Sequence, residues 1–189
     1  MFEEIAIYLI TIVSSLLGAA LLLRAWAQAV RLAPNNPFSR AVYQATNWLV
    51  LPLRRVLPGF AGIDWACIVG AWLTAVVALA LAVLIRGYSP LLLLPMGLVV
   101  ALLTVVKWGL NLMLWLTVLM GILSWVNPRT EAMWALQQLT APLLNPIRRR
   151  LPATGGIDFS LLVLIILIQV ALMVLARAIF ALYGFQSAL

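Results

Sequence analysis

The chain has 189 residues, of which 66% are hydrophobic and only 9% are charged, and its mean hydropathy is +1.14. Soluble domains have roughly 45–50% apolar and about 25% charged residues, so this composition argues against a soluble enzyme, a disordered chain or a nucleic-acid binder. The net charge of +7 therefore indicates a membrane protein with basic loops. With no histidine, one cysteine and five acidic residues, we expect neither catalysis nor a metal or other cofactor.

Four apolar stretches are candidate membrane spans, since a helix crosses a bilayer with about 20 predominantly apolar residues. Three of them are uncharged over residues 5–23, 65–85 and 159–176, and the last resumes its apolar run after Arg177. Glu3 and Glu4 precede the first stretch and Arg24 follows it, which places the amino terminus on the outer side of the membrane. The acidic start also lacks the basic region of a signal peptide.

The apolar run between Gly87 and Val126 is interrupted only by Lys107, so it is either two spans with a hairpin at the lysine or one span with a lead-in. The flanking residues include no proline and no Asn-Gly pair, which makes a hairpin unfavourable. Pro90 and Pro95 interrupt the first third of the run. We therefore predict one span over about residues 99–125, preceded by a broken or interfacial segment.

An internal duplication sets the predicted topology. Residues 44–64 and 138–158 align without gaps at an offset of 94, with 11 identities in 21 positions. The same offset maps the first span onto the third and the second onto the fourth. The single domain, residues 1–189, is thus interpreted as two tandem parallel repeats, about residues 1–88 and 95–183. The predicted fold class is an all-α membrane protein with four transmembrane helices, each repeat being helix, amphipathic cytoplasmic loop and helix.

Basic residues are concentrated in the two loops. Nine of the twelve lie there: Arg24, Arg31, Arg40, Arg54, Arg55, Arg129, Arg148, Arg149 and Arg150. Loops rich in arginine and lysine stay in the cytoplasm. Both loops are therefore predicted to be cytoplasmic, and both termini extracytoplasmic.

Each loop contains an amphipathic stretch. In the first loop, apolar residues recur at spacings of three and four: Phe38, Ala41, Val42, Ala45, Trp48, Leu49 and Pro52. In the second loop, Ala135, Leu136, Leu139 and Leu143 continue this face at the same offset. Two interpretations stay open, a helix lying in the membrane interface and a helix packed against the protein's own spans, and both can hold.

A Pro-x-Arg-Arg-x-Leu-Pro motif follows each amphipathic stretch. Its prolines are Pro52 and Pro58 in the first loop and Pro146 and Pro152 in the second, and we expect them to make the motif rigid and non-helical at its edges. The arginines, Arg54 and Arg55, then Arg148 and Arg149, are expected to contact lipid phosphates or a partner protein. The alternative is that they act only as a topology signal.

Gly-Ile-Asp then precedes the second and fourth spans. Gly62 and Gly156 allow a sharp turn into the membrane. Asp64 and Asp158 are expected to cap the following helices through their side chains. An ion or proton site formed by the two acids is the functional alternative, and a third possibility is that the acids also pair with Arg55 or Arg149 across the repeats.

Two polar residues lie inside the third span, Lys107 and Asn111. Polar groups at membrane depth call for a functional hypothesis. The favoured interpretation is that they form hydrogen bonds between helices. They would otherwise belong to a pore formed by several copies of the chain.

The duplicated motif, with Ser124-Trp125-Val126 before the second loop and residues 155–160 after it, resembles the YggT family over essentially the whole chain. The first copy departs from the stronger form at Ala61 and at Trp65-Ala66. The resemblance implies a multi-pass protein of the bacterial inner membrane. It links bacterial relatives to osmotic stress, potassium supply and envelope organisation, and plastid relatives to maturation of a c-type cytochrome and to nucleoid distribution.

Two functions are weighed against each other. The first is a non-catalytic scaffold, assembly or envelope-organisation factor that acts through its two basic loops. The second is a component of ion transport, for potassium or in osmotic stress, that works as an oligomer. The expected partners are anionic lipids, an unidentified membrane protein and further copies of the chain, with no direct contact to nucleic acid.

Overall fold

The computed structural model describes residues 1–32, 37–57, 59, 62–151 and 158–186, and this part of the chain contains helices and no strands. The elements are α1 (Phe2–Ala29), α2 (Pro37–Val56), α3 (Trp65–Ile85), the 3₁₀ turn η1 (Pro90–Leu93), α4 (Met96–Val126), α5 (Glu131–Arg148) and α6 (Phe159–Gln186). Helices α1, α3, α4 and α6 are long and apolar enough to cross a membrane. The predicted all-α class with four spans is confirmed.

The third span is a single helix. α4 runs unbroken through Lys107 for 31 residues, so the hairpin interpretation is wrong. The lead-in is broken, as predicted, by η1, where the Ser89 hydroxyl accepts a hydrogen bond from the Leu91 N–H. The first span differs from its prediction because α1 continues past Arg24 to Ala29. Arg24 is accommodated inside the protein, because α2 supplies hydrogen-bond partners for its side chain.

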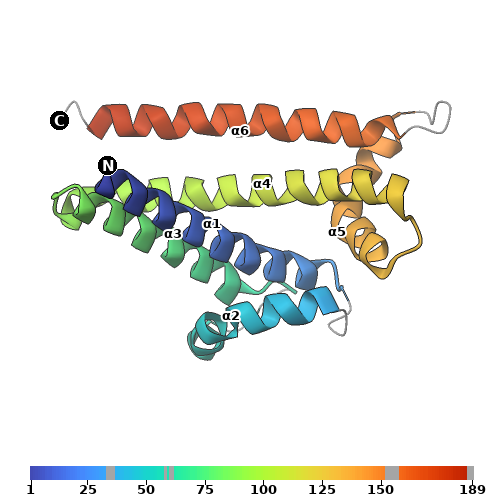
Figure 1. The fold of residues 1–189 in the computed structure, drawn as a ribbon, viewed down its shortest axis with the longest axis horizontal. Coiled ribbons are helices and arrows are strands. Elements are labelled where there is room, and N and C mark those ends of the chain that lie inside the picture. Colours follow the sequence, from blue (N-terminus) through green and yellow to red (C-terminus); the bar gives the residue numbers. More distant parts are fainter. Residues whose placement is uncertain (33–36, 58, 60–61, 152–157, 187–189) are drawn as a thin grey trace.

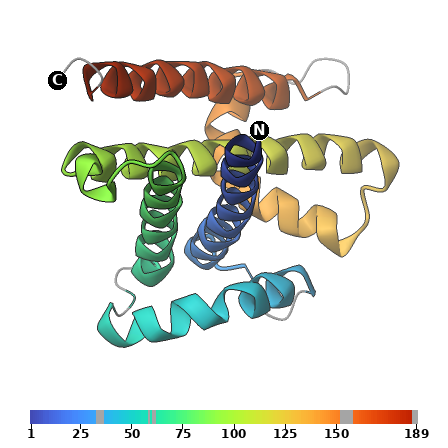
Figure 2. The same ribbon diagram turned by 60° about the vertical axis from the view of Figure 1, so that its left-hand side comes forward.

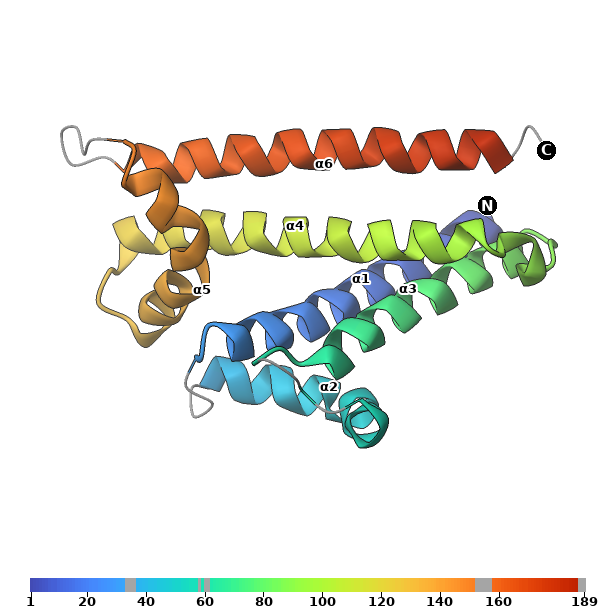
Figure 3. The ribbon, with the colours of Figure 1, turned by 180° about the vertical axis from the view of Figure 1, so that it is seen from behind.

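The spanning helices form two hairpins, α1 with α3 and α4 with α6, and α4 also packs against α1 and α3 (Figure 1). α6 lies at the edge and packs mainly against α4 and α5 (Figure 3). Gly18 of α1 lies against the ring of Trp108 in α4, and a Cβ at residue 18 would overlap that ring. The absence of a side chain at Gly18 therefore permits the close approach of α1 to α4.

Helix α5 lies at one end of α4 and α6, whereas α2 lies below them, across the ends of α1 and α3 (Figures 1 and 2). The start of α1 and the connection between α3 and α4 lie at the other end, where α6 also finishes (Figure 1).

Two buried clusters hold the elements together. One joins α1, α2, α3 and α4 around Leu21, Val50, Cys67 and Ala101. The other joins α4, α5 and α6 and includes Leu23 and Leu32 at and beyond the end of α1. Within the second cluster, the Trp26 indole N–H donates a 2.8 Å hydrogen bond to the Leu139 carbonyl, which links α1 to α5.

The prolines of the arginine motif do not end the helices. Pro52 lies inside α2, and Pro142 and Pro146 lie inside α5, so the prediction of non-helical edges is wrong at Pro52 and Pro146. A proline removes one N–H and crowds the carbonyl four residues earlier, which bends a helix without necessarily ending it. Both ribbons change direction along their length (Figure 1). Pro58, Pro152 and Gly156 lie outside the described residues.

Candidate functional site

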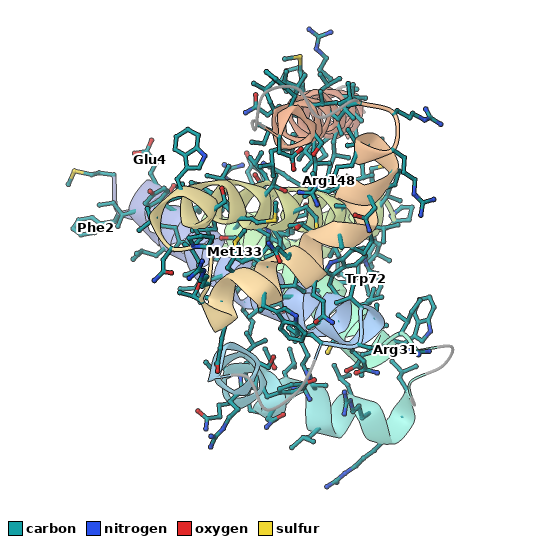
Figure 4. All side chains as sticks on the ribbon, turned by 90° about the vertical axis from the view of Figure 1, so that its right-hand side faces the viewer. Phe2, Glu4, Arg31, Trp72, Met133 and Arg148 are labelled. Atoms are coloured by element: carbon teal, nitrogen blue, oxygen red, sulfur yellow. The ribbon has the colours of Figure 1, made fainter. Side chains whose placement is uncertain are left out.

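An arginine and an aspartate join each amphipathic helix to the span that follows it. Arg54 of α2 donates to Asp64, which directly precedes α3. Arg148 of α5 donates to Asp158 from Nε at 2.9 Å and from Nη2 at 2.5 Å. Figure 4 views this end of the molecule, with Arg148 where α5 meets α6. The same pair, ten residues apart, thus forms in both halves of the chain.

The third possibility, in which the aspartates pair with Arg55 or Arg149 across the repeats, is wrong. Each aspartate binds the first arginine of its own loop, Arg54 or Arg148. Successive residues of a helix are turned by about 100°, so one arginine of each pair faces the next span and its neighbour does not. Arg55 and Arg149 are accordingly exposed.

The two aspartates differ in how they meet their helices. Asp158 accepts a 3.1 Å hydrogen bond from the Ser160 N–H, so its side chain caps α6 as expected. Asp64 makes no such side-chain cap at α3. One of its oxygens instead accepts from Arg54 and, at 3.1 Å, from the Cys67 thiol. The chain turns just before it at Gly62, whose φ of +79° is one that glycine adopts without strain.

Arg24 is a functional candidate, although its position after an apolar span indicates only a topology signal. It belongs to α1, is 3% exposed, and donates from Nη1 to the Thr46 hydroxyl at 2.8 Å and to the Asn47 side-chain oxygen at 2.9 Å. Its guanidinium lies 4.5 Å from the ring centroid of Tyr43. Its Nε lies 4.0 Å from Asp64. Arg24 therefore links α1, α2 and the start of α3.

A signal for this cluster exists in the sequence. Tyr43, Thr46 and Asn47 stand at spacings of three and four, so they share one face of α2. That polar face packs inward, with Thr46 fully buried. The lone arginine near the end of an apolar span is the group that such a face can satisfy.

The second half of the chain lacks this cluster. At the offset of 94, Val118 aligns with Arg24 and Ala141 aligns with Asn47. Thr140 aligns with Thr46 and donates to the Met120 sulfur at 3.0 Å. The ion pair of the second half is also more open, with Asp158 37% exposed against 1% for Asp64. Among the described residues, only the first half therefore places two arginines, the buried Arg24 and the partly exposed Arg54, around one buried carboxylate.

The electrostatics keep both ion pairs charged. Burial alone would raise the pKa of Asp64, but its hydrogen bonds to Arg54 and Cys67 hold the pKa below its usual value. Hydrogen bonding to Asp64 raises the pKa of Arg54 further. The pKa of Asp158 is also lowered, because hydrogen bonds from Ser160 and Arg148 outweigh partial burial. Both carboxylates are therefore ionised at neutral pH.

The two amphipathic helices use their apolar faces differently. α2 packs inward with Thr46 and Val50 and leaves Trp48 65% and Leu51 54% exposed, beside the exposed Arg55. α5 instead buries apolar residues that the pattern singled out, namely Ala135, Leu136 and Leu139. Thus α2 fits an interfacial helix that also packs on the spans. α5 fits a helix packed against the protein's own spans.

Lys107 and Asn111 do not form the expected hydrogen bonds between helices. The Asn111 amide donates at 2.9 Å to the Lys107 carbonyl within α4, and the Lys107 side chain is exposed. The expectation of an interhelical contact is therefore wrong for Asn111. Among the described residues, no group of three histidine, cysteine or acidic side chains could hold a metal ion.

Comparison with known proteins identifies relatives over most of the chain. The family model CCB3/YggT matches residues 4–85 and 99–179. "Uncharacterized protein YggT" of Escherichia coli (strain K12) is 38% identical over 164 residues, covering 86% of this chain and 85% of that protein. "Uncharacterized protein in proC 3'region" of Vibrio alginolyticus is 36% identical over 165 residues, 87% of this chain and 89% of that protein. No solved structure matches.

Proposed function

The chain belongs to the CCB3/YggT family, and from this premise we propose that it is a non-catalytic scaffold of the bacterial inner membrane. In this proposal it assembles or organises envelope proteins through two basic helices, α2 and α5, held at the cytoplasmic side. The observation that carries the proposal is that the two arginines of each pair have different surroundings. One arginine is fixed to the next span and the other is presented outward.

The fixed arginines supply rigidity. Arg54 ties the end of α2 to Asp64 before α3, and Arg148 ties the end of α5 to Asp158 before α6. A helix anchored at its end loses less conformational freedom when it binds, which favours binding. This supports a display surface rather than a flexible basic tail.

The outward arginines supply the contact. Arg55, Arg149 and Arg150 are exposed and follow directly on the anchored positions. Guanidinium groups bind phosphate and carboxylate with two parallel hydrogen bonds. The exposed Trp48 near Arg55 suits the boundary between headgroups and acyl chains. We therefore infer that α2 contacts anionic lipid and that the exposed arginines of both loops contact lipid or an acidic partner.

Transport is the weaker candidate. Asp64 is neutralised by Arg54, and Lys107 points out of the bundle rather than into a path between helices. An ion path through this chain would therefore have to be built between copies. No contact among the described residues specifically favours it.

The proposal is tested by in-membrane crosslinking of a tagged protein followed by mass spectrometry. The test variant is Arg55→Ala/Arg149→Ala/Arg150→Ala, which leaves both ion pairs intact. The matched control, Arg86→Ala/Lys107→Ala/Arg177→Ala, removes the same charge away from the two loops. We expect a reproducible partner that the first variant loses and the second keeps, at equal amounts of inserted protein. Full retention by the first variant would contradict the proposal.

A further inference from the structure

The outer face of α6 carries a regular stripe of exposed side chains. They recur at spacings of four, three, four, three and four: Leu162, Ile166, Gln169, Met173, Ala176 and Phe180. The opposite face, with Leu164 and Ile168, is buried in the second cluster. Alternating steps of three and four give the period of 3.5 residues at which two helices pack along a left-handed seam. The stripe thus has the spacing of a helix-packing surface.

Gln169 is the one strongly polar residue of this stripe. It is the tenth residue after Phe159, about 15 Å along the helix, and close to the middle of the apolar window Phe159–Leu182. Its side-chain amide has no hydrogen-bond partner in the described part of the chain. Lipid tails offer none, and an unsatisfied amide in hydrocarbon is unfavourable. Gln169 therefore calls for a polar partner at the same depth.

The aligned face of α3 is already covered by a helix. At the offset of 94, Trp72 aligns with Ile166 and Ala75 aligns with Gln169. Ala75 is fully buried, and the Trp72 indole N–H donates at 3.2 Å to the Leu98 carbonyl of α4. Among the described elements, none covers this face of α6 in the way that α4 covers α3. The stripe is thus the corresponding face of the second hairpin, and its side chains are exposed. Figure 3 shows α6 at the edge of the molecule.

We propose that this face binds α6 of a second copy of the chain, with the two Gln169 amides bonded to each other at the centre of the interface. All copies insert in one orientation, so two α6 helices meet in parallel and equal residues lie at equal depth. A side-chain amide both donates and accepts, which makes it complementary to itself across a two-fold axis. A single polar residue in such a seam fixes its register.

Disulfide crosslinking tests the interface in native membranes. In a Cys67→Ser background, cysteine is placed on the stripe (Ile166→Cys, Met173→Cys) and, as matched controls, at exposed positions away from it (Leu167→Cys, Val174→Cys). The controls are as exposed as the test positions, at 55% and 63% against 51% and 62%. We expect oxidised dimers from the first two variants and at least fivefold less from the controls.

A second measurement addresses Gln169 itself. Gln169→Leu should weaken the dimer, measured as the monomer fraction on dilution in bilayers, whereas Gln169→Asn should keep most of it. Because residue 169 is exposed in one chain, neither change disturbs the monomer core. Equal crosslinking from stripe and control positions would overturn the proposal, as would a monomer at every dilution.

Discussion

The guanidinium of Arg24 in α1 donates a 2.8 Å hydrogen bond to the hydroxyl of Thr46 in α2, and both side chains are buried. The contact ties the amphipathic helix to the end of the first span. Arg24 Nε also lies 4.0 Å from the Asp64 carboxylate, so one guanidinium contacts residues of α1, α2 and the start of α3. The first half of the chain therefore has a polar core where α1 meets α2, which the second half replaces with largely apolar contacts.

Replacing Arg24 should loosen α2. Arg24→Met keeps the length of the side chain but leaves Thr46 and Asn47 without their donor, and hydrogen bonds to charged groups contribute about 1.5–3 kcal/mol each. We expect a loss of about 2–4 kcal/mol, measured by thermal unfolding in detergent. Arg31→Met removes an exposed charge and is the control. Equal stability of the two variants would contradict the assigned role.

The two aspartates should differ in importance. Asp64→Asn breaks a pair whose carboxylate is 1% exposed, and breaking a buried pair costs about 3–5 kcal/mol. Asp158→Asn breaks a pair that is about two-fifths exposed, where solvent screening limits the effect to about 1 kcal/mol. The measurement is the free energy of unfolding of both variants under one condition. A larger loss of unfolding free energy in Asp158→Asn than in Asp64→Asn would contradict the greater importance of Asp64.

Acid should destabilise the protein through these carboxylates. The folded-state pKa values of Asp64 and Asp158 lie below the ordinary 3.8, so their contribution is present above that pH and is lost as the pH falls through the folded values. These two carboxylates should therefore leave the free energy of unfolding independent of pH near neutrality. The free energy should fall below about pH 4. In Asp64→Asn the fall should be smaller. A melting-temperature series across this range provides the measurement.

The contact of Gly18 with Trp108 gives a test of the packing between α1 and α4. A methyl group at residue 18 would overlap the indole, so Gly18→Ala should destabilise by about 1–3 kcal/mol. Gly121→Ala is the control, because nothing lies within 4 Å of its Cβ position and alanine is the better helix former. The two variants should shift the melting temperature in opposite directions. A shift of the same sign and size would contradict the close approach.

Much of the fold follows from the sequence because hydrophobic length alone decides where a helix can cross a bilayer. The span through Lys107 could be predicted as one helix, since its flanks contain no turn residues. The orientation of α2 could not be predicted. Lipid tails and a protein interior are both apolar, so the pattern around Trp48 identifies an apolar face without saying which of the two covers it. The structure buries Thr46 and exposes Trp48.

The sequence predicts which residues belong to the candidate site, but not which arginine pairs with the aspartate. The motif identified Arg54, Arg55 and Asp64 as residues of interest. Which arginine meets the aspartate depends on the helical phase through Pro52, and the motif had been expected to be non-helical at that edge. Arg24 was missed because a basic residue after an apolar run is usually explained by the positive-inside rule. Its burial depends on partners that are more than 20 residues away.

The central claim, that the outward side of α2 contacts another molecule while the inward side serves the fold, is tested most directly by site-specific photocrosslinking. A photoreactive residue is placed at Val56, which is 78% exposed beside Arg55, or at Leu53, which packs in the first cluster. The account predicts crosslinks to lipid or another protein from residue 56 that Arg55→Ala reduces, and intramolecular crosslinks from residue 53. Crosslinks to other molecules from residue 53, or none from residue 56, would contradict it.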